Sequence, residues 1–180
     1  MSSKEIQQLN PKKNAPYVGF PVVWQCGFEC TYCLPGGETS ASTVRVADSS
    51  KVIETARIAH SLGTRKFRIT GGEPFLHKDL GTILYALSEM HDTQTTVNTT
   101  GTPIKDRQGI ISNTPENVRF IVSLDSLDKE EFDKVRVSKV DDMYERVMEG
   151  IQTLAERGIL KRLNTVVTRD NIEGVFKILN

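Results

Sequence analysis

Residues 66–74 read Lys66-Phe-Arg-Ile-Thr-Gly-Gly-Glu-Pro74, a short predicted strand that is closed by two glycines and precedes a helical pattern starting near Asp79. A strand that leads through glycine into a helix is typical of β–α–β units. The same order recurs along the chain. We expect strands at 17–24, 66–70, 94–98, 118–123 and 161–168, and helices at 49–62, 79–91, 103–112, 128–136, 141–157 and 171–179. This alternation predicts an α/β fold, with a parallel sheet and helices outside it.

The 180-residue chain has room for one domain with a sizeable core. We expect residues 1–15, which are rich in Ser, Lys, Asn and Gln, to form a flexible leader, and residues 16–180 to form the core domain. Lys+Arg and Asp+Glu balance at 23 each, so the charge does not favour a nucleic-acid partner. No stretch approaches the ~20 apolar residues that span a bilayer. The N-terminus has no apolar signal-peptide core, so we expect a cytoplasmic location and no membrane partner.

Unusual residues gather where the predicted strands end. The first four strands are followed by three cysteines, by Gly71-Gly72-Glu73-Pro74, by Asn98-Thr99-Thr100-Gly101 and by Ser123-Leu124-Asp125-Ser126. The carboxyl ends of parallel strands meet at one edge of the sheet, where α/β proteins place their chemistry. The sequence therefore predicts a single site at this edge.

The three cysteines all lie in Cys26-Gly-Phe-Glu-Cys30-Thr-Tyr-Cys33, with the spacing C-x3-C-x2-C. An odd, tightly spaced set is a poor disulfide framework, so it indicates a metal site. Three thiolates can hold a 4Fe–4S cluster and leave one iron open for a cofactor or substrate. Spacing alone leaves two alternatives. One is zinc with His60, His77 or His91 as a fourth ligand, and the other is unliganded buried cysteines.

The other strand-end residues have two interpretations each. Gly71 and Gly72 allow a ligand to approach the backbone closely, or they form an ordinary tight turn. Asp125 binds a ligand or caps the following helix. Arg68 and Arg162 lie within predicted strands. Pointing inward they would suit a phosphate or carboxylate substrate, and pointing outward they would form edge ion pairs.

The cysteine spacing with Tyr32 before the third cysteine, together with the downstream Gly71-Gly72-Glu73-Pro74, resembles the signature of the radical S-adenosylmethionine (radical SAM) superfamily. The resemblance implies a partial (β/α) barrel, with about five βα units present and the sixth missing. It also implies that Cys26, Cys30 and Cys33 bind a 4Fe–4S cluster, and that SAM is the second cofactor.

Within the superfamily, the chain resembles the first half of the GTP 3′,8-cyclase (MoaA-type) family of molybdenum cofactor biosynthesis. The similar segments are Lys66–Pro74, Val122–Asp128 and Leu163–Val167. The resemblance assigns two sets of residues: Tyr32, Gly71, Gly72, Glu73 and Ser123 to SAM, and Arg68, Asn98 and Arg162 to the substrate, for which GTP is the best guess. Gly19 stands where the family has an arginine for GTP, and Asn98 replaces a threonine.

The resemblance implies reductive cleavage of SAM to a 5′-deoxyadenosyl radical that abstracts a hydrogen atom from a small-molecule substrate. A flavodoxin or ferredoxin would supply the electron. A peptide, a sugar or a natural-product intermediate is the alternative substrate. A zinc-stabilised interaction module, or an inactive fragment, is the alternative from another class.

Overall fold

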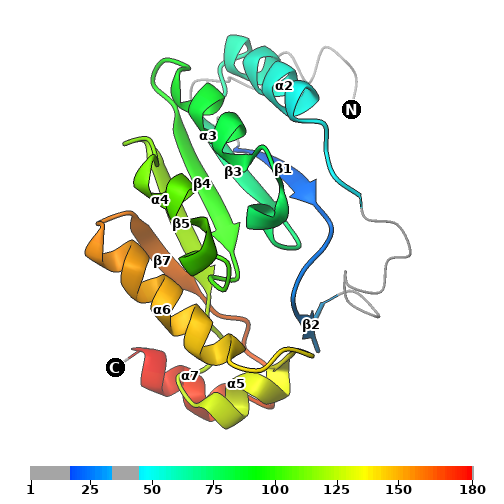
Figure 1. Ribbon diagram of the computed structural model, residues 1–180, viewed down its shortest axis with the longest axis vertical. Coiled ribbons are helices and arrows are strands. Elements are labelled where there is room, and N and C mark those ends of the chain that lie inside the picture. Colours follow the sequence, from blue (N-terminus) through cyan, green and yellow to red (C-terminus); the bar gives the residue numbers. More distant parts are fainter. Residues whose placement is uncertain (1–16, 34–44, 180) are drawn as a thin grey trace, which may run out of the picture.

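The computed structural model describes residues 17–33 and 45–179 (Figure 1). Its main sheet has five parallel strands in the order β1-β3-β4-β5-β7: β1 Val18–Val23, β3 Lys66–Gly71, β4 Gln94–Thr99, β5 Val118–Ser123 and β7 Leu160–Asn164. Neighbouring strands follow one another along the chain, which confirms the predicted α/β fold with five βα units. The predicted leader, 1–15, lies outside the described residues.

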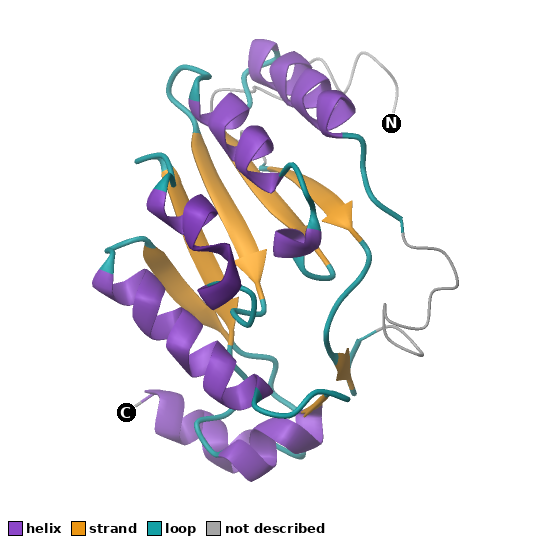
Figure 2. Cartoon of the chain, viewed as in Figure 1, coloured by secondary structure: helices purple, strands orange, loops and turns teal. Residues whose placement is uncertain are grey.

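Along the chain, a helix follows each strand of this sheet before the next one begins, and these helices cover one face of the sheet (Figure 2). They are α2 Ser49–Ser61, α3 Leu80–Ser88, α4 Gln108–Ser112 and α6 Met143–Glu156, with two short 3-10 turns, η2 Pro74–Leu76 and η3 Lys105–Arg107. Two more helices, α5 Lys129–Val135 and α7 Ile172–Leu179, follow the carboxyl ends of β5 and β7. Among the described residues, no helix has both the length and the apolar character to cross a membrane.

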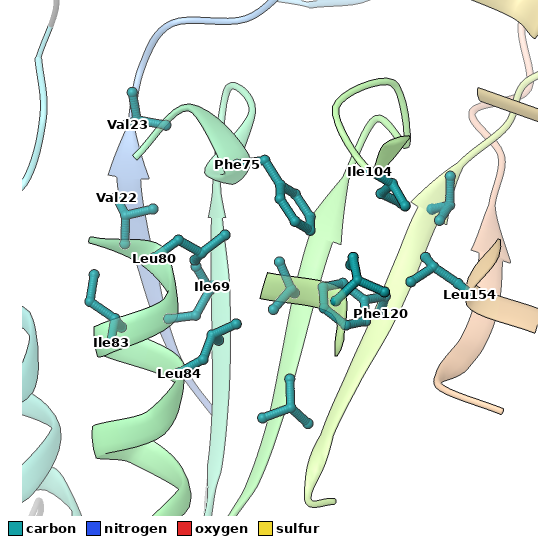
Figure 3. Packing of buried hydrophobic residues seen from close by; sticks show 14 of the residues in the cluster. Val22, Val23, Ile69, Phe75, Leu80, Ile83, Leu84, Ile104, Phe120 and Leu154 are labelled. Atoms are coloured by element: carbon teal, nitrogen blue, oxygen red, sulfur yellow. The ribbon is translucent and has the colours of Figure 1, made fainter. Parts of the chain in front are cut away.

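The hydrophobic core fills the space between the sheet and these helices (Figure 3). Leu80, Ile83, Leu84 and Leu87 of α3 follow a helical spacing and are all buried, as the sequence pattern predicts. They pack in one cluster with buried strand residues, among them Ile69 and Phe120. This core holds the strands in register and so fixes where each strand ends.

The other face of the sheet is lined mainly by polar side chains. In β3, Phe67 and Ile69 are buried, so the two-residue period of a strand turns Arg68 the opposite way. Asn98 of β4 lies opposite Ile121 of β5, which in turn lies opposite Arg162 of β7. Parallel sheets are usually covered by apolar layers on both faces, so a polar second face is suited to a ligand.

Three local features differ from the sequence-based expectations. The helix predicted at 103–112 is divided into η3 and α4, and β7 ends at Asn164 rather than at residue 168. Beyond Asn164 the Val166 N–H donates to the Asp125 side chain, and the Thr168 N–H donates to the Asn171 side chain. Side chains thus satisfy these two backbone N–H groups, so this segment needs no hydrogen bonds to a neighbouring strand. The third feature is a two-stranded antiparallel sheet, β2 Glu29–Cys30 with β6 Arg136–Val137.

Candidate cluster and cofactor site

The cysteine loop follows β1 directly and is held by β6. Cys30 pairs with Arg136 across the small antiparallel sheet, and the Thr31 N–H donates to the Val135 carbonyl at 3.0 Å. In Figure 1 this pairing lies on the side of the molecule toward which the strands of the main sheet run. The three thiols therefore lie where the sequence predicted the site. Cys26 and Cys30 are half-buried and Cys33 is exposed.

The surroundings of the Cys26 thiol make it hard to ionise. Burial is the main cause that raises its pKa, to about 11 in all; the charges of Glu73 and Cys30 add to the rise, and the Phe28 N–H and Arg136 oppose it. Thiolate is the form that binds metals, so ionisation of Cys26 at neutral pH calls for a bound positive group.

The donor set fits a cluster better than a single zinc ion. In the two described segments, no three His, Cys, Asp or Glu side chains gather closely enough to hold one ion. His77 is buried with both ring nitrogens engaged, since Nε2 bonds to the Ala47 carbonyl at 2.9 Å and Nδ1 accepts from the Asp79 N–H at 3.1 Å. His60 Nε2 bonds to the His91 carbonyl at 2.8 Å. His77 therefore has no ring nitrogen left for a metal, and a cubane, which takes each thiolate on a different iron, accommodates a wider set of three thiols than one ion does.

The segment Gly71–Glu73 is hydrogen-bonded to the end of β1 and to the chain that follows it. The Gly72 N–H donates to the Val23 carbonyl at 2.7 Å, and the Glu73 N–H donates to the Gln25 carbonyl at 2.8 Å. Gly71 has φ +138°, and a Cβ there would lie 2.1 Å from the Val23 oxygen. This position therefore requires glycine. Because both N–H groups are taken, the segment can offer a ligand its carbonyl oxygens, which suit an ammonium group.

The Glu73 carboxylate is committed within the protein. It is buried, and it accepts hydrogen bonds from Thr99 Oγ1 at 2.9 Å, from the Thr100 N–H at 2.7 Å and from the Phe75 N–H at 3.1 Å. Burial raises the pKa of this carboxyl, and the Thr100, Phe75 and Thr99 hydrogen bonds oppose the shift. Glu73 thus ties the end of β3 to the end of β4, and its backbone is also engaged, since its N–H donates to the Gln25 carbonyl and its carbonyl accepts from the Leu76 N–H at 3.0 Å.

A second buried carboxylate links the cysteine loop to the end of β5. Tyr32 Oη donates to Asp125 Oδ2 at 2.7 Å, and the Arg136 Nε lies 3.6 Å from the same oxygen. Asp125 and Arg136 are 0% and 3% exposed. The Arg136 guanidinium lies 4.4 Å from the centre of the Phe28 ring and donates to the Ser123 carbonyl. This network brings Tyr32 and Ser123, both predicted SAM contacts, to one place.

Only a weak sequence signal pointed to this network. Asp125 follows a buried strand, which marked it as a ligand or cap residue, but the helix after it is capped by Asp128, whose carboxylate accepts from the Glu130 and Glu131 N–H groups. Arg136 had no signal, since it lies in a charged stretch at the end of a predicted helix.

The substrate residues predicted from the resemblance share the polar face of the sheet. Arg68 and Arg162 line one cavity of about 110 Å³, together with Tyr17 and two lysines, and no carboxylate of the described residues lines it. The Arg68 guanidinium lies 4.1 Å from the centre of the Tyr17 ring, and the Arg162 Nε donates to Asn164 Oδ1 at 3.1 Å. Within the described segments, Arg68 Nε and Asn98 Oδ1 are buried without a hydrogen-bond partner. Buried polar atoms are normally paired, so both suit a ligand.

Together these features define a parallel α/β protein whose sheet carries helices on one face, polar side chains on the other, and a three-cysteine loop at the strand ends. The sequence profile of the Radical SAM superfamily matches residues 23–180. The chain belongs to this superfamily.

Relatives and solved structures agree with this assignment. A probable GTP 3′,8-cyclase of Sulfolobus acidocaldarius is 32% identical over 156 residues, which are 86% of this chain and 48% of that protein. The GTP 3′,8-cyclase of Pectobacterium atrosepticum is 32% identical over 157 residues, 86% of this chain and 47% of that protein. Streptococcus suis SuiB bound to S-adenosylmethionine has a similar fold, with a TM-score of 0.70 at 21% identity over 91% of this chain and 35% of SuiB. The chain thus spans about half the length of the curated relatives it matches.

Proposed function

We propose that this chain binds a 4Fe–4S cluster through Cys26, Cys30 and Cys33 and uses it to cleave SAM reductively. The observation that carries the proposal is the position of the three-cysteine loop, which follows β1 at the strand ends of a radical SAM fold and whose entry at Gln25 is hydrogen-bonded to Glu73. When bound and reduced, such a cluster supplies the electron that breaks the C5′–S bond of SAM and yields a 5′-deoxyadenosyl radical, which takes a hydrogen atom from the substrate.

The residues around the thiols have distinct tasks in this proposal. The Gly71 and Gly72 carbonyls accept from the SAM amino group, because the Gly72 and Glu73 N–H groups are already bonded to β1 and its exit and the Glu73 carbonyl already accepts from the Leu76 N–H. Ser123 lies on the polar face at the end of β5, and Tyr32 lies inside the cysteine loop. These groups orient SAM and exclude water from it, which protects a reactive species from side reactions.

The substrate that best fits the polar face is an anion, and we propose GTP. Arg68 and Arg162 line one cavity with Lys66 and Lys161, so four cationic residues and no carboxylate are found among the described residues that line it. One guanidinium group can bind two phosphate oxygens at once. Within the described segments, Arg68 Nε has no hydrogen-bond partner and is available for such a contact. The two relatives named as GTP 3′,8-cyclases support this substrate. In the proposal, a flavodoxin or ferredoxin supplies the electron.

Replacing one cluster ligand tests the proposal. We expect Cys30→Ala to lose the 4Fe–4S absorbance and nearly all bound iron after anaerobic reconstitution, because two thiolates cannot hold a cubane that needs three. Iron, acid-labile sulfide and zinc are measured for each protein.

Thr31→Ala is the matched control, since it alters an exposed neighbour in the same loop and keeps all three thiols. It should retain the wild-type iron content. A full iron complement in Cys30→Ala, or zinc without iron in the wild-type protein, would contradict the ligand set.

A further inference from the structure

We propose that Asp125 is a positioning residue for the SAM site, which acts by holding the hydroxyl group of Tyr32. The inference rests on the proposed function and deepens it, because it explains how the ring inside the cysteine loop is oriented. The sequence motif indicates an aromatic residue before the third cysteine, and the structure adds a partner for its hydroxyl group from 93 residues further along the chain.

The contact between the two side chains is direct. Tyr32 Oη donates to Asp125 Oδ2 at 2.7 Å, and hydrogen bonds to an ionised acceptor are among the stronger ones in proteins. This one side-chain hydrogen bond joins the cysteine loop to the segment that follows β5.

Asp125 is itself held firmly. Its side chain is 0% exposed, and Oδ1 accepts from the Val166 N–H at 2.8 Å. Its backbone carbonyl accepts from Asn171 Nδ2 at 2.8 Å. A ring tied to such an anchor has one orientation, and orientation to within a fraction of an ångström is what a cofactor site requires.

The loop has anchors that do not depend on Tyr32. Cys30 pairs with Arg136, Thr31 donates to the Val135 carbonyl, and Phe28 packs edge-on against Phe132 with ring centres 6.0 Å apart. Loss of the Tyr32 hydroxyl should therefore free the ring and leave the loop and its thiols in place. This separates a positioning role from a purely structural one.

Tyr32→Phe tests the inference, because it removes the hydrogen bond and keeps the ring. The reconstituted, reduced protein is titrated with SAM, and the dissociation constant is taken from the change that SAM makes in the EPR spectrum of the cluster. We expect the dissociation constant to rise about tenfold, which corresponds to about 1.4 kcal/mol. Iron content should equal that of the wild type. A wild-type dissociation constant in Tyr32→Phe would overturn the inference.

Tyr144→Phe is the matched control, since Tyr144 Oη donates to the Leu127 carbonyl at 2.7 Å away from the cysteine loop. It should leave the dissociation constant unchanged. If the wild-type protein holds a full cluster and its EPR spectrum does not change on addition of SAM, that result would instead overturn the proposed function, and the inference with it.

Discussion

Asp125→Ala is expected to lower the free energy of unfolding by about 3–5 kcal/mol, because it leaves the charge of a buried arginine without its partner. Arg136 is 3% exposed, and its Nε lies 3.6 Å from the Asp125 carboxylate. The same change removes the acceptor for Tyr32 Oη and for the Val166 N–H. Since domains are typically stable by about 5–15 kcal/mol, the variant should be marginal. Urea denaturation of the cluster-free protein measures the loss.

Two further variants make this result specific. Asp106→Ala breaks an exposed pair with Arg146, with the Asp106 side chain 61% exposed, and should cost less than about 1 kcal/mol. Adding Arg136→Met to Asp125→Ala should recover much of the loss, because the unpaired charge is gone. If Asp125→Ala lowers the free energy of unfolding no more than Asp106→Ala does, the buried pair does not stabilise the fold as proposed.

Gly71→Ala is expected to cost several kcal/mol and to impair cluster loading. Its φ of +138° is strained for alanine by about 1–3 kcal/mol. The new Cβ would lie 2.1 Å from the Val23 oxygen, and overpacking of this kind typically costs a further 1–3 kcal/mol or so. Relief of the clash would push the end of β1 away from β3, and with it the chain that leads to Cys26. Urea denaturation and the iron content after reconstitution measure the two effects.

Gly109→Ala is the matched control, since a Cβ at that position in α4 meets nothing within 4 Å. An alanine in a helix is more stable than glycine by roughly 0.5–1 kcal/mol, so this variant should be as stable as the wild type or slightly more so. A Gly71→Ala protein with wild-type stability and iron content would show that β1 and β3 do not meet as closely as described.

The parallel sheet could be predicted from the sequence because its determinants are local. Short strand patterns alternate with helical ones along the chain, and the buried positions of α3 repeat at helical spacing. The site edge could also be predicted, since the unusual residues all follow strands. The two-residue strands β2 and β6 could not, because segments of that length have no period to detect.

The contacts that organise the site were harder to predict because they join distant residues. Nothing in the sequence near Arg136 or Asp125 indicates that they form a buried pair. Likewise, the residues around Glu73 do not indicate that its side chain accepts hydrogen bonds from Thr99 and Thr100. The sequence also did not determine on which face of the sheet the Arg162 side chain lies. The register between β5 and β7 shifts between Phe120 and Ile121, so alternation along β7 could not assign it from the sequence.

The central claim is that the three thiols support reductive cleavage of SAM, and it is tested most directly by the product of that cleavage. The reconstituted protein is incubated anaerobically with SAM and dithionite, and 5′-deoxyadenosine is measured by mass spectrometry. We predict that 5′-deoxyadenosine forms with the wild-type protein and is absent with Cys26→Ala, Cys30→Ala and Cys33→Ala. A wild-type protein with a full 4Fe–4S cluster that forms no 5′-deoxyadenosine, or a cysteine variant that forms as much as the wild type, would contradict the claim.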